Sequence, residues 1–131
     1  MNTKLLMTSS GFFMAASGIT LSFFPHEILQ FADQKPSLVM DLVLQVLGAL
    51  YLGFAMLNWM AKGNLIGGIY SRPVAIGNLA HFLIAGLALL KAAFTMGNSP
   101  FVWALAIIYA GFALAFGLVT FTHPAKVKAA V

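Results

Sequence analysis

Four long runs of apolar residues alternate with short polar segments along the chain. The runs lie at about 5–24, 38–61, 74–95 and 100–122. Each is close to the roughly 20 residues that an α-helix needs to cross the hydrocarbon core of a bilayer. The pattern predicts an all-α protein, a four-transmembrane-helix up-and-down bundle, with residues 1–131 in a single membrane domain.

Local signals separate these runs. Ser37 precedes the second run, where its side chain can cap the helix, and Asp41 would lie in the first turn, favoured by the helix dipole. Pro73 suits the first turn of the third helix. The segment 25–37 mixes acidic and apolar residues, which predicts a short amphipathic turn in the membrane interface.

The composition supports a membrane setting. Hydrophobic residues make up 61% of the chain and charged residues only 8%, and the mean hydropathy is +0.95. A soluble domain usually carries about 25% charged residues. The chain has no cysteine, which excludes disulfide exchange and thiolate metal sites. The net charge of +4 comes from scattered basic residues, so we expect no nucleic-acid partner.

The basic residues also predict the orientation, because loops on the cytoplasmic side are enriched in lysine and arginine. The orientation that places most of the basic residues on the cytoplasmic side also places both termini in the cytoplasm. Lys35 and a snorkelling Lys91 would then lie on the outer side, near Glu27, Asp33 and Asp41. The residues assigned to the cytoplasmic side are Lys4, Lys62, Arg72, Lys126 and Lys128.

Polar residues within the apolar runs are the candidate site, because unpaired polar groups are costly in hydrocarbon. Asn58 near the end of the second helix and Asn78 near the start of the third are expected at similar depths, with His81 one turn deeper on the face of Asn78. Tyr51 lies on the same face of the second helix as Asn58. Arg72 would lie at the mouth of a cavity between the second and third helices. One interpretation is an inner-leaflet cavity. The other is hydrogen bonding that only joins the helices.

Small residues four apart and aromatic residues near the helix ends have ordinary membrane roles. The small pairs let helices approach closely, and the aromatic rings anchor in the interface. The pairs are Gly11 and Ala15, Ala88 and Ala92, and Gly111 and Ala115; the rings are Trp59, Tyr70 and Trp103.

Enzyme signatures are missing from the sequence. It contains no zinc-protease motif, no paired carboxylates within a run and no nucleotide-binding fingerprint. His26, His81 and His123 are expected at different levels and form no metal site. We therefore assign no catalytic residue, metal or cofactor, and we favour a protein that is not an enzyme.

The order of motifs resembles the small four-helix DoxX-like membrane proteins of bacteria. The shared layout spans all four helices: Phe24-Pro25-His26-Glu27, then Gln45-x-x-Gly48 with Tyr51 and Asn58-Trp59, then Arg72-Pro73 and Asn78-x-x-His81. This resemblance implies an up-and-down bundle in a bacterial inner membrane. Most such proteins lack an assigned activity, although one branch is associated with quinone-linked sulfur oxidation.

The first functional hypothesis is that the protein binds a lipid or quinone-like amphiphile in a cavity between the second and third helices. The residues assigned to it are Tyr51, Asn58, Arg72, Asn78 and His81. The alternative is an accessory or scaffolding subunit of a larger membrane complex, and an enzyme or transporter is a third hypothesis. Expected partners are membrane lipids and either a second copy of the chain or another membrane protein.

Overall fold

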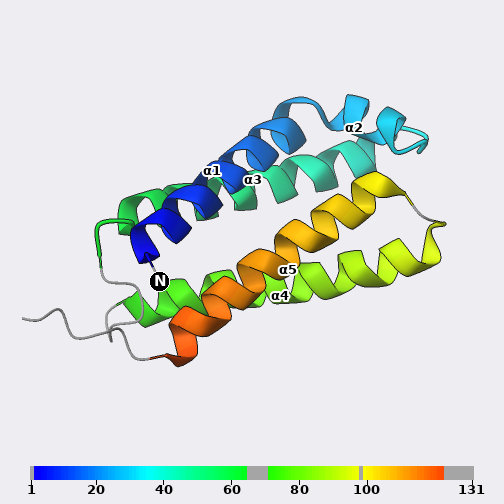
Figure 1. Cartoon of the computed structure of the whole chain (residues 1–131). Helices are drawn as coiled ribbons and strands as arrows, with labels where there is room; N and C mark the ends of the chain where they lie inside the picture. Colours follow the sequence, from blue (N-terminus) through cyan, green and yellow to red (C-terminus); the bar gives the residue numbers. More distant parts are fainter. Residues whose placement is uncertain (1, 65–70, 98, 123–131) are drawn as a thin grey trace, which may run out of the picture. The chain divides into compact units, whose positions relative to one another are not determined.

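The computed structural model describes residues 2–64, 71–97 and 99–122, and these residues form five helices and no strand. The helices are α1 (Thr3–Phe23), α2 (Pro25–Phe31), α3 (Leu38–Ala61), α4 (Arg72–Thr95) and α5 (Pro100–Phe121) (Figure 1). All except α2 are long and apolar enough to cross a membrane. The predicted all-α class with four long apolar helices is confirmed. Tyr70, His123, Lys126 and Lys128 lie outside the described residues.

The helix ends follow the local signals in the sequence. The Ser37 side chain accepts a hydrogen bond from the Met40 backbone N–H at 3.2 Å, so it caps α3 as predicted. Prolines occupy the first turns of α2, α4 and α5, where the missing N–H costs no helical hydrogen bond. Gly97 has φ of +61°, in the left-handed region that glycine enters without steric cost, and it follows the end of α4.

The helices form two compact units, and each is described by itself. The first comprises residues 5–62 and contains α1, α2 and α3. The second is centred on α4 and α5. The prediction of a single membrane domain stays a prediction, as does the up-and-down order of all four long helices.

In the first unit, α1 and α3 run antiparallel and cross at glycines. A Cβ on Gly18 would lie 2.9 Å from the Gly48 carbonyl oxygen, and a Cβ on Gly48 would lie 2.7 Å from the Ser22 backbone nitrogen. Seven residues before Gly18, Gly11 faces Ala55 and Trp59. Side chains larger than hydrogen do not fit at the Gly18–Gly48 crossing, so the two backbones are in direct contact.

The connection between α1 and α3 contains the short helix α2, where an amphipathic turn was expected. Pro25 and Leu29 of α2 are buried, whereas Phe31 and the following polar residues are exposed. Asp33 adopts a positive φ of 55°, which reverses the chain after α2. An exposed aromatic ring among polar residues is typical of a segment that lies in the interface.

In the second unit, α4 and α5 form an antiparallel helix pair. A Cβ on Gly86 would lie 3.4 Å from the Tyr109 Cβ, in ordinary contact. Phe94 and Trp103 meet edge to face near the turn, with ring centroids 5.0 Å apart. Of the predicted small pairs, Gly111 has no atom within 4 Å of an added Cβ, and Ala88 is exposed. Gly111 and Ala88 therefore do not mark the contact between α4 and α5.

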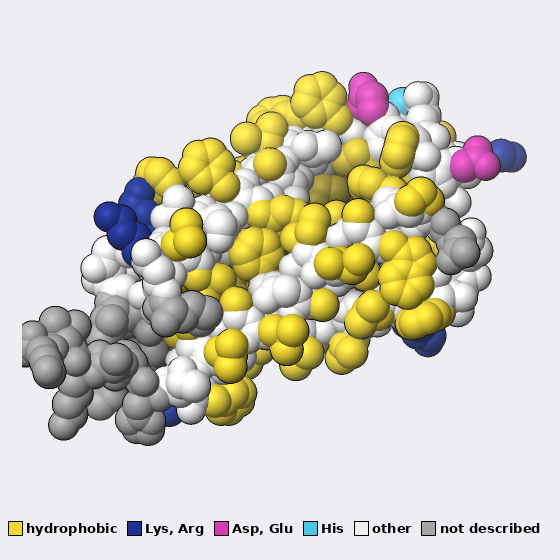
Figure 2. Space-filling view, in the orientation of Figure 1, with side chains coloured by type: hydrophobic (Ala, Val, Ile, Leu, Met, Phe, Trp, Pro, Cys, Tyr) yellow, Lys and Arg dark blue, Asp and Glu magenta, His cyan; other side chains and the backbone are white. Residues whose placement is uncertain are grey.

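Large apolar side chains cover much of the exposed surface of the long helices (Figure 2). Only a few of each helix's apolar residues are buried within the structure, and α3 has the smallest buried share of the four. A soluble monomer rarely exposes contiguous apolar surface on this scale. Hydrocarbon around the helices accounts for it, because apolar side chains have no cost of exposure there.

Candidate functional site

Asn58 is fully buried and ties α3 to α1. Its amide nitrogen, Nδ2, donates to the Ser10 hydroxyl oxygen at 3.1 Å and lies 3.8 Å from the Met14 sulfur. The Ser10 hydroxyl in turn donates to the Met7 carbonyl oxygen at 3.2 Å. Met7, Ser10 and Met14 all lie on the buried face of α1, so the amide is enclosed by these side chains.

Tyr51 lies seven residues before Asn58, and both are buried on the same face of α3. Gly48 and Ala55 are buried on this face as well, which continues the line of small residues in contact with α1. The predicted stripe that joins Tyr51 and Asn58 is therefore present. It belongs to the face of α3 that meets α1.

Asn78 and His81 share a face of α4. Asn78 is fully buried, and its Nδ2 donates to the Val74 carbonyl oxygen one turn earlier at 2.9 Å. The His81 ring, one turn after Asn78, lies against two aromatic rings. Its centroid is 5.1 Å from the Phe82 ring and 5.8 Å from the Tyr109 ring of α5. His81 is therefore half-buried at the contact between α4 and α5.

The two rings beside His81 belong to an aromatic cluster that was not predicted from the sequence. Phe82, which is fully buried, stacks with Phe112 at a centroid distance of 4.8 Å and with Phe116 at 5.8 Å. Tyr109 meets the Phe82 ring at 5.4 Å. The spacing of Tyr109, Phe112 and Phe116 by three and four residues is the helical signal that would have placed them on one face.

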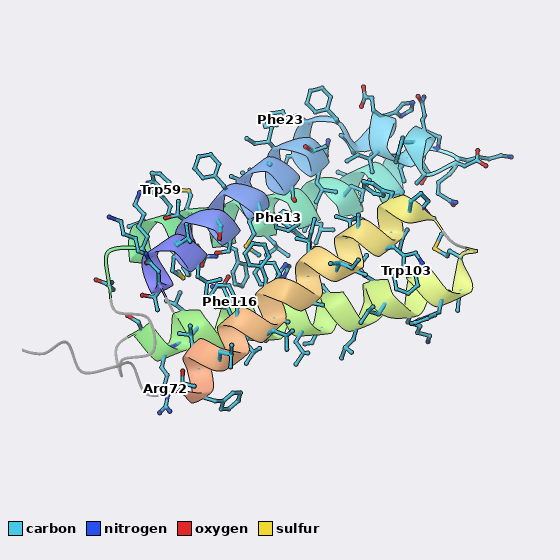
Figure 3. The ribbon with its side chains drawn as sticks, viewed as in Figure 1. Phe13, Phe23, Trp59, Arg72, Trp103 and Phe116 are labelled. Carbon is cyan, nitrogen blue, oxygen red and sulfur yellow. The ribbon has the colours of Figure 1, made fainter. Side chains whose placement is uncertain are left out.

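Arg72 is the first residue of α4 and is exposed. Its side chain extends outward from the start of the helix (Figure 3). At about 1.5 Å per residue, Arg72 lies roughly 9 Å along the helix axis from Asn78 and roughly 14 Å from His81. Arg72 therefore lies at the start of the apolar helix and His81 well within it; that Arg72 lies at the mouth of a cavity stays a prediction.

The structure thus groups the predicted residues as Tyr51 with Asn58 in the first unit, and Arg72, Asn78 and His81 in the second. The prediction that all five line one cavity stays a prediction. Across residues 2–64, 71–97 and 99–122, no three His, Asp or Glu side chains come close enough to hold a metal ion.

The end of the first unit that carries α2 holds a polar contact that was not predicted from the sequence. His26 of α2 places Nδ1 3.8 Å from Asp41 Oδ2 in the first turn of α3. The other carboxylate oxygen, Oδ1, is buried without a hydrogen-bond partner among the described residues. Because half of the His26 side chain is exposed, the pair contributes little to stability.

Comparison with known proteins adds no relative. No family model matches the chain, and neither a curated protein nor a solved structure matches it.

Proposed function

We propose that the protein is a multi-pass integral membrane protein, with both termini in the cytoplasm, in the inner membrane of a bacterium. Four helices of sufficient length and hydropathy support this proposal. The apolar side chains on their exposed faces support it as well. Its function in that membrane is to bind a lipid or quinone-like amphiphile through polar residues within the spans.

The observation that carries the binding proposal is the position of His81. This ionisable residue lies inside an apolar span and against the Tyr109 ring, rather than at a helix end. Ionisable residues within membrane spans are costly and usually serve a function. In the proposed site, the Asn78 amide and the His81 imidazole hydrogen-bond the polar head of the amphiphile, and Arg72 attracts an anionic group at the surface.

Tyr51 and Asn58 are proposed as further contributors. The Asn58 amide nitrogen already donates to Ser10, so the main role of this residue is to join α3 to α1. Both interpretations of the polar residues are therefore proposed, one for each unit. Asn58 supplies hydrogen bonding between helices, and the α4 residues supply recognition.

Native mass spectrometry of the full chain, released from a mild detergent, tests this proposal. We expect the protein to retain an adduct of defined mass. His81→Leu removes one hydrogen-bonding group and should reduce the retained fraction roughly three- to tenfold. Leu87→Ala, a change at an exposed position of α4, is the matched control and should retain the adduct. A protein without an adduct, or equal retention by His81→Leu, would contradict the proposal.

One observation favours the alternative function as an accessory subunit. The exposed face of α3 has a shallow apolar hollow of about 320 Å³, lined by Val39, Leu42, Val43 and Val46. Branched side chains of this kind can receive the ridge of a neighbouring transmembrane helix. A membrane protein that copurifies at fixed stoichiometry, and is lost on Val43→Phe, would favour this function instead.

A further inference from the structure

An apolar groove runs along the surface of the first unit between α1 and α3, separate from the polar residues of α4. It encloses about 370 Å³, near the lower end of the range for ligand pockets. Its lining includes Gly11, Phe12 and Ala15 on α1, and Met56, Trp59 and Met60 on α3. The two small α1 residues leave space that the Phe12 and Trp59 rings border.

The groove has one aromatic end. The Phe12 and Trp59 rings meet edge to face there, with centroids 6.0 Å apart. From Trp59 the α3 side of the groove continues through Met56 to Leu52, a distance of roughly 10 Å along the helix axis. Because Trp59 lies near the end of α3, where an indole ring favours the membrane interface, the groove leads from the interface into the hydrocarbon region.

The same end carries a positive charge with no acidic residue near it. The Lys62 ammonium nitrogen lies 2.9 Å from the centroid of the Trp59 ring, so the lysine is held over the aromatic end of the groove. The chain has three acidic residues, Glu27, Asp33 and Asp41, and all belong to α2, its following turn or the start of α3. Figure 2 shows the acidic side chains at the α2 end, with a basic side chain beside them, and basic side chains without acidic neighbours at the other end.

We propose that this groove binds one acyl chain of an anionic glycerophospholipid, whose phosphate group contacts Lys62. The apolar lining accepts the chain, and the interfacial Trp59 positions the glycerol region. An ammonium group has three N–H donors, so Lys62 can stay over the indole ring and still donate to a phosphate oxygen. A zwitterionic lipid would fill the same groove without the gain from charge. This inference does not depend on the amphiphile site of α4.

Quenching of tryptophan fluorescence by lipids with brominated acyl chains tests the inference, because bromine quenches an indole ring that it contacts. The full chain with Trp103→Phe keeps Trp59 as its single tryptophan. It is reconstituted in vesicles that contain either brominated phosphatidylglycerol or brominated phosphatidylcholine in an unbrominated background. The ratio of quenching by the two lipids, measured within each variant, gives the preference for the anionic head group.

We expect phosphatidylglycerol to be preferred about fivefold, the effect of one basic residue at a membrane surface. Lys62→Gln should abolish this preference, whereas Lys35→Gln, the same change beyond α2 at the opposite end of the unit, should leave it intact. Ala15→Leu fills the groove and should reduce quenching by both lipids. Ala16→Leu, on the exposed side of α1, is its matched control.

Three results would overturn the inference. Equal quenching by the two lipids would mean that the groove accepts bilayer chains without regard to charge. A preference that survives Lys62→Gln would place the selectivity elsewhere. Protection of Trp59 from both lipids would mean that a second copy of the chain covers the groove. If Ala15→Leu does not fold, the comparison of Lys62→Gln with Lys35→Gln still decides the question.

Discussion

Replacing Gly48 by alanine tests whether α1 and α3 are held together by direct backbone contact. The new methyl carbon would lie 2.7 Å from the Ser22 backbone nitrogen and 2.9 Å from the Gly18 carbonyl oxygen. Both atoms belong to the backbone of α1, so no side-chain rotation relieves the clash. The helices would have to separate by roughly 0.7 Å to restore the 3.4 Å of ordinary contact.

The cost follows from the size of this displacement. Extra methyl groups forced into closely packed interiors cost about 1–3 kcal/mol. Separation of the helices would also lengthen the hydrogen bond from Asn58 to Ser10, which is 3.1 Å in this unit. We therefore expect Gly48→Ala to lower the free energy of unfolding by about 2 kcal/mol.

Unfolding in mild detergent, followed by circular dichroism during titration with a denaturing detergent, measures this change. Gly53→Ala is the matched control, because Gly53 lies in the same helix and an added Cβ there has no atom within 4 Å. It should leave stability unchanged or raise it by up to about 1 kcal/mol, through the helix propensity of alanine. Equal stability of the two variants would refute the backbone contact.

Three further outcomes are expected. In the same titration, Phe82→Ala should lower the free energy of unfolding by about 3–5 kcal/mol, because the ring is fully buried in the α4–α5 contact. Leu87→Ala, at an exposed position, should lower it by no more than about 0.5 kcal/mol. Ser10→Ala removes the acceptor of the Asn58 amide and should lower the free energy of unfolding by about 1 kcal/mol. An unchanged free energy of unfolding would contradict the hydrogen bond from Asn58 to Ser10. A fluorescent reporter that matures only in the cytoplasm should be active at the C-terminus, and activity restricted to a periplasmic reporter would reverse the topology.

The helix boundaries were predictable because their signals are local. Ser37 caps α3 through its own side chain, and prolines mark the first turns of α4 and α5. The length and hydropathy of each run then identify a possible span without knowledge of its neighbours. Such features depend on residues within one or two turns, so the sequence alone determines them.

The helix contacts were harder to predict. The closest crossing of α1 and α3 uses Gly18 and Gly48, which were not predicted, whereas the predicted Gly11 also faces α3 and the predicted Gly111 has no atom within 4 Å of an added Cβ. Small residues are abundant in every span, and which of them meet depends on the relative depth and rotation of two helices. The spacing of Gly11 and Gly18 by seven residues was the available signal for one face of α1.

The candidate site was only partly predictable for a related reason. The sequence identified Asn58, Asn78 and His81 by their polarity, but the partners of these side chains are ordinary residues. Ser10 accepts from Asn58, and Tyr109 lies against His81. Neither partner is unusual for a membrane helix, so its role appears only when two helices are placed together.

The glycine crossing has a consequence for how the protein enters the membrane. Of the four spans, α1 has the lowest mean hydropathy and the largest buried share, and serine and threonine hydroxyls bond back to its own carbonyl groups. By this measure α1 partitions into lipid less strongly than the other three helices do. Since α1 precedes α3 along the chain, the Gly18–Gly48 contact forms only after α3 has been synthesised, and we expect α1 to be held less firmly in the membrane until then.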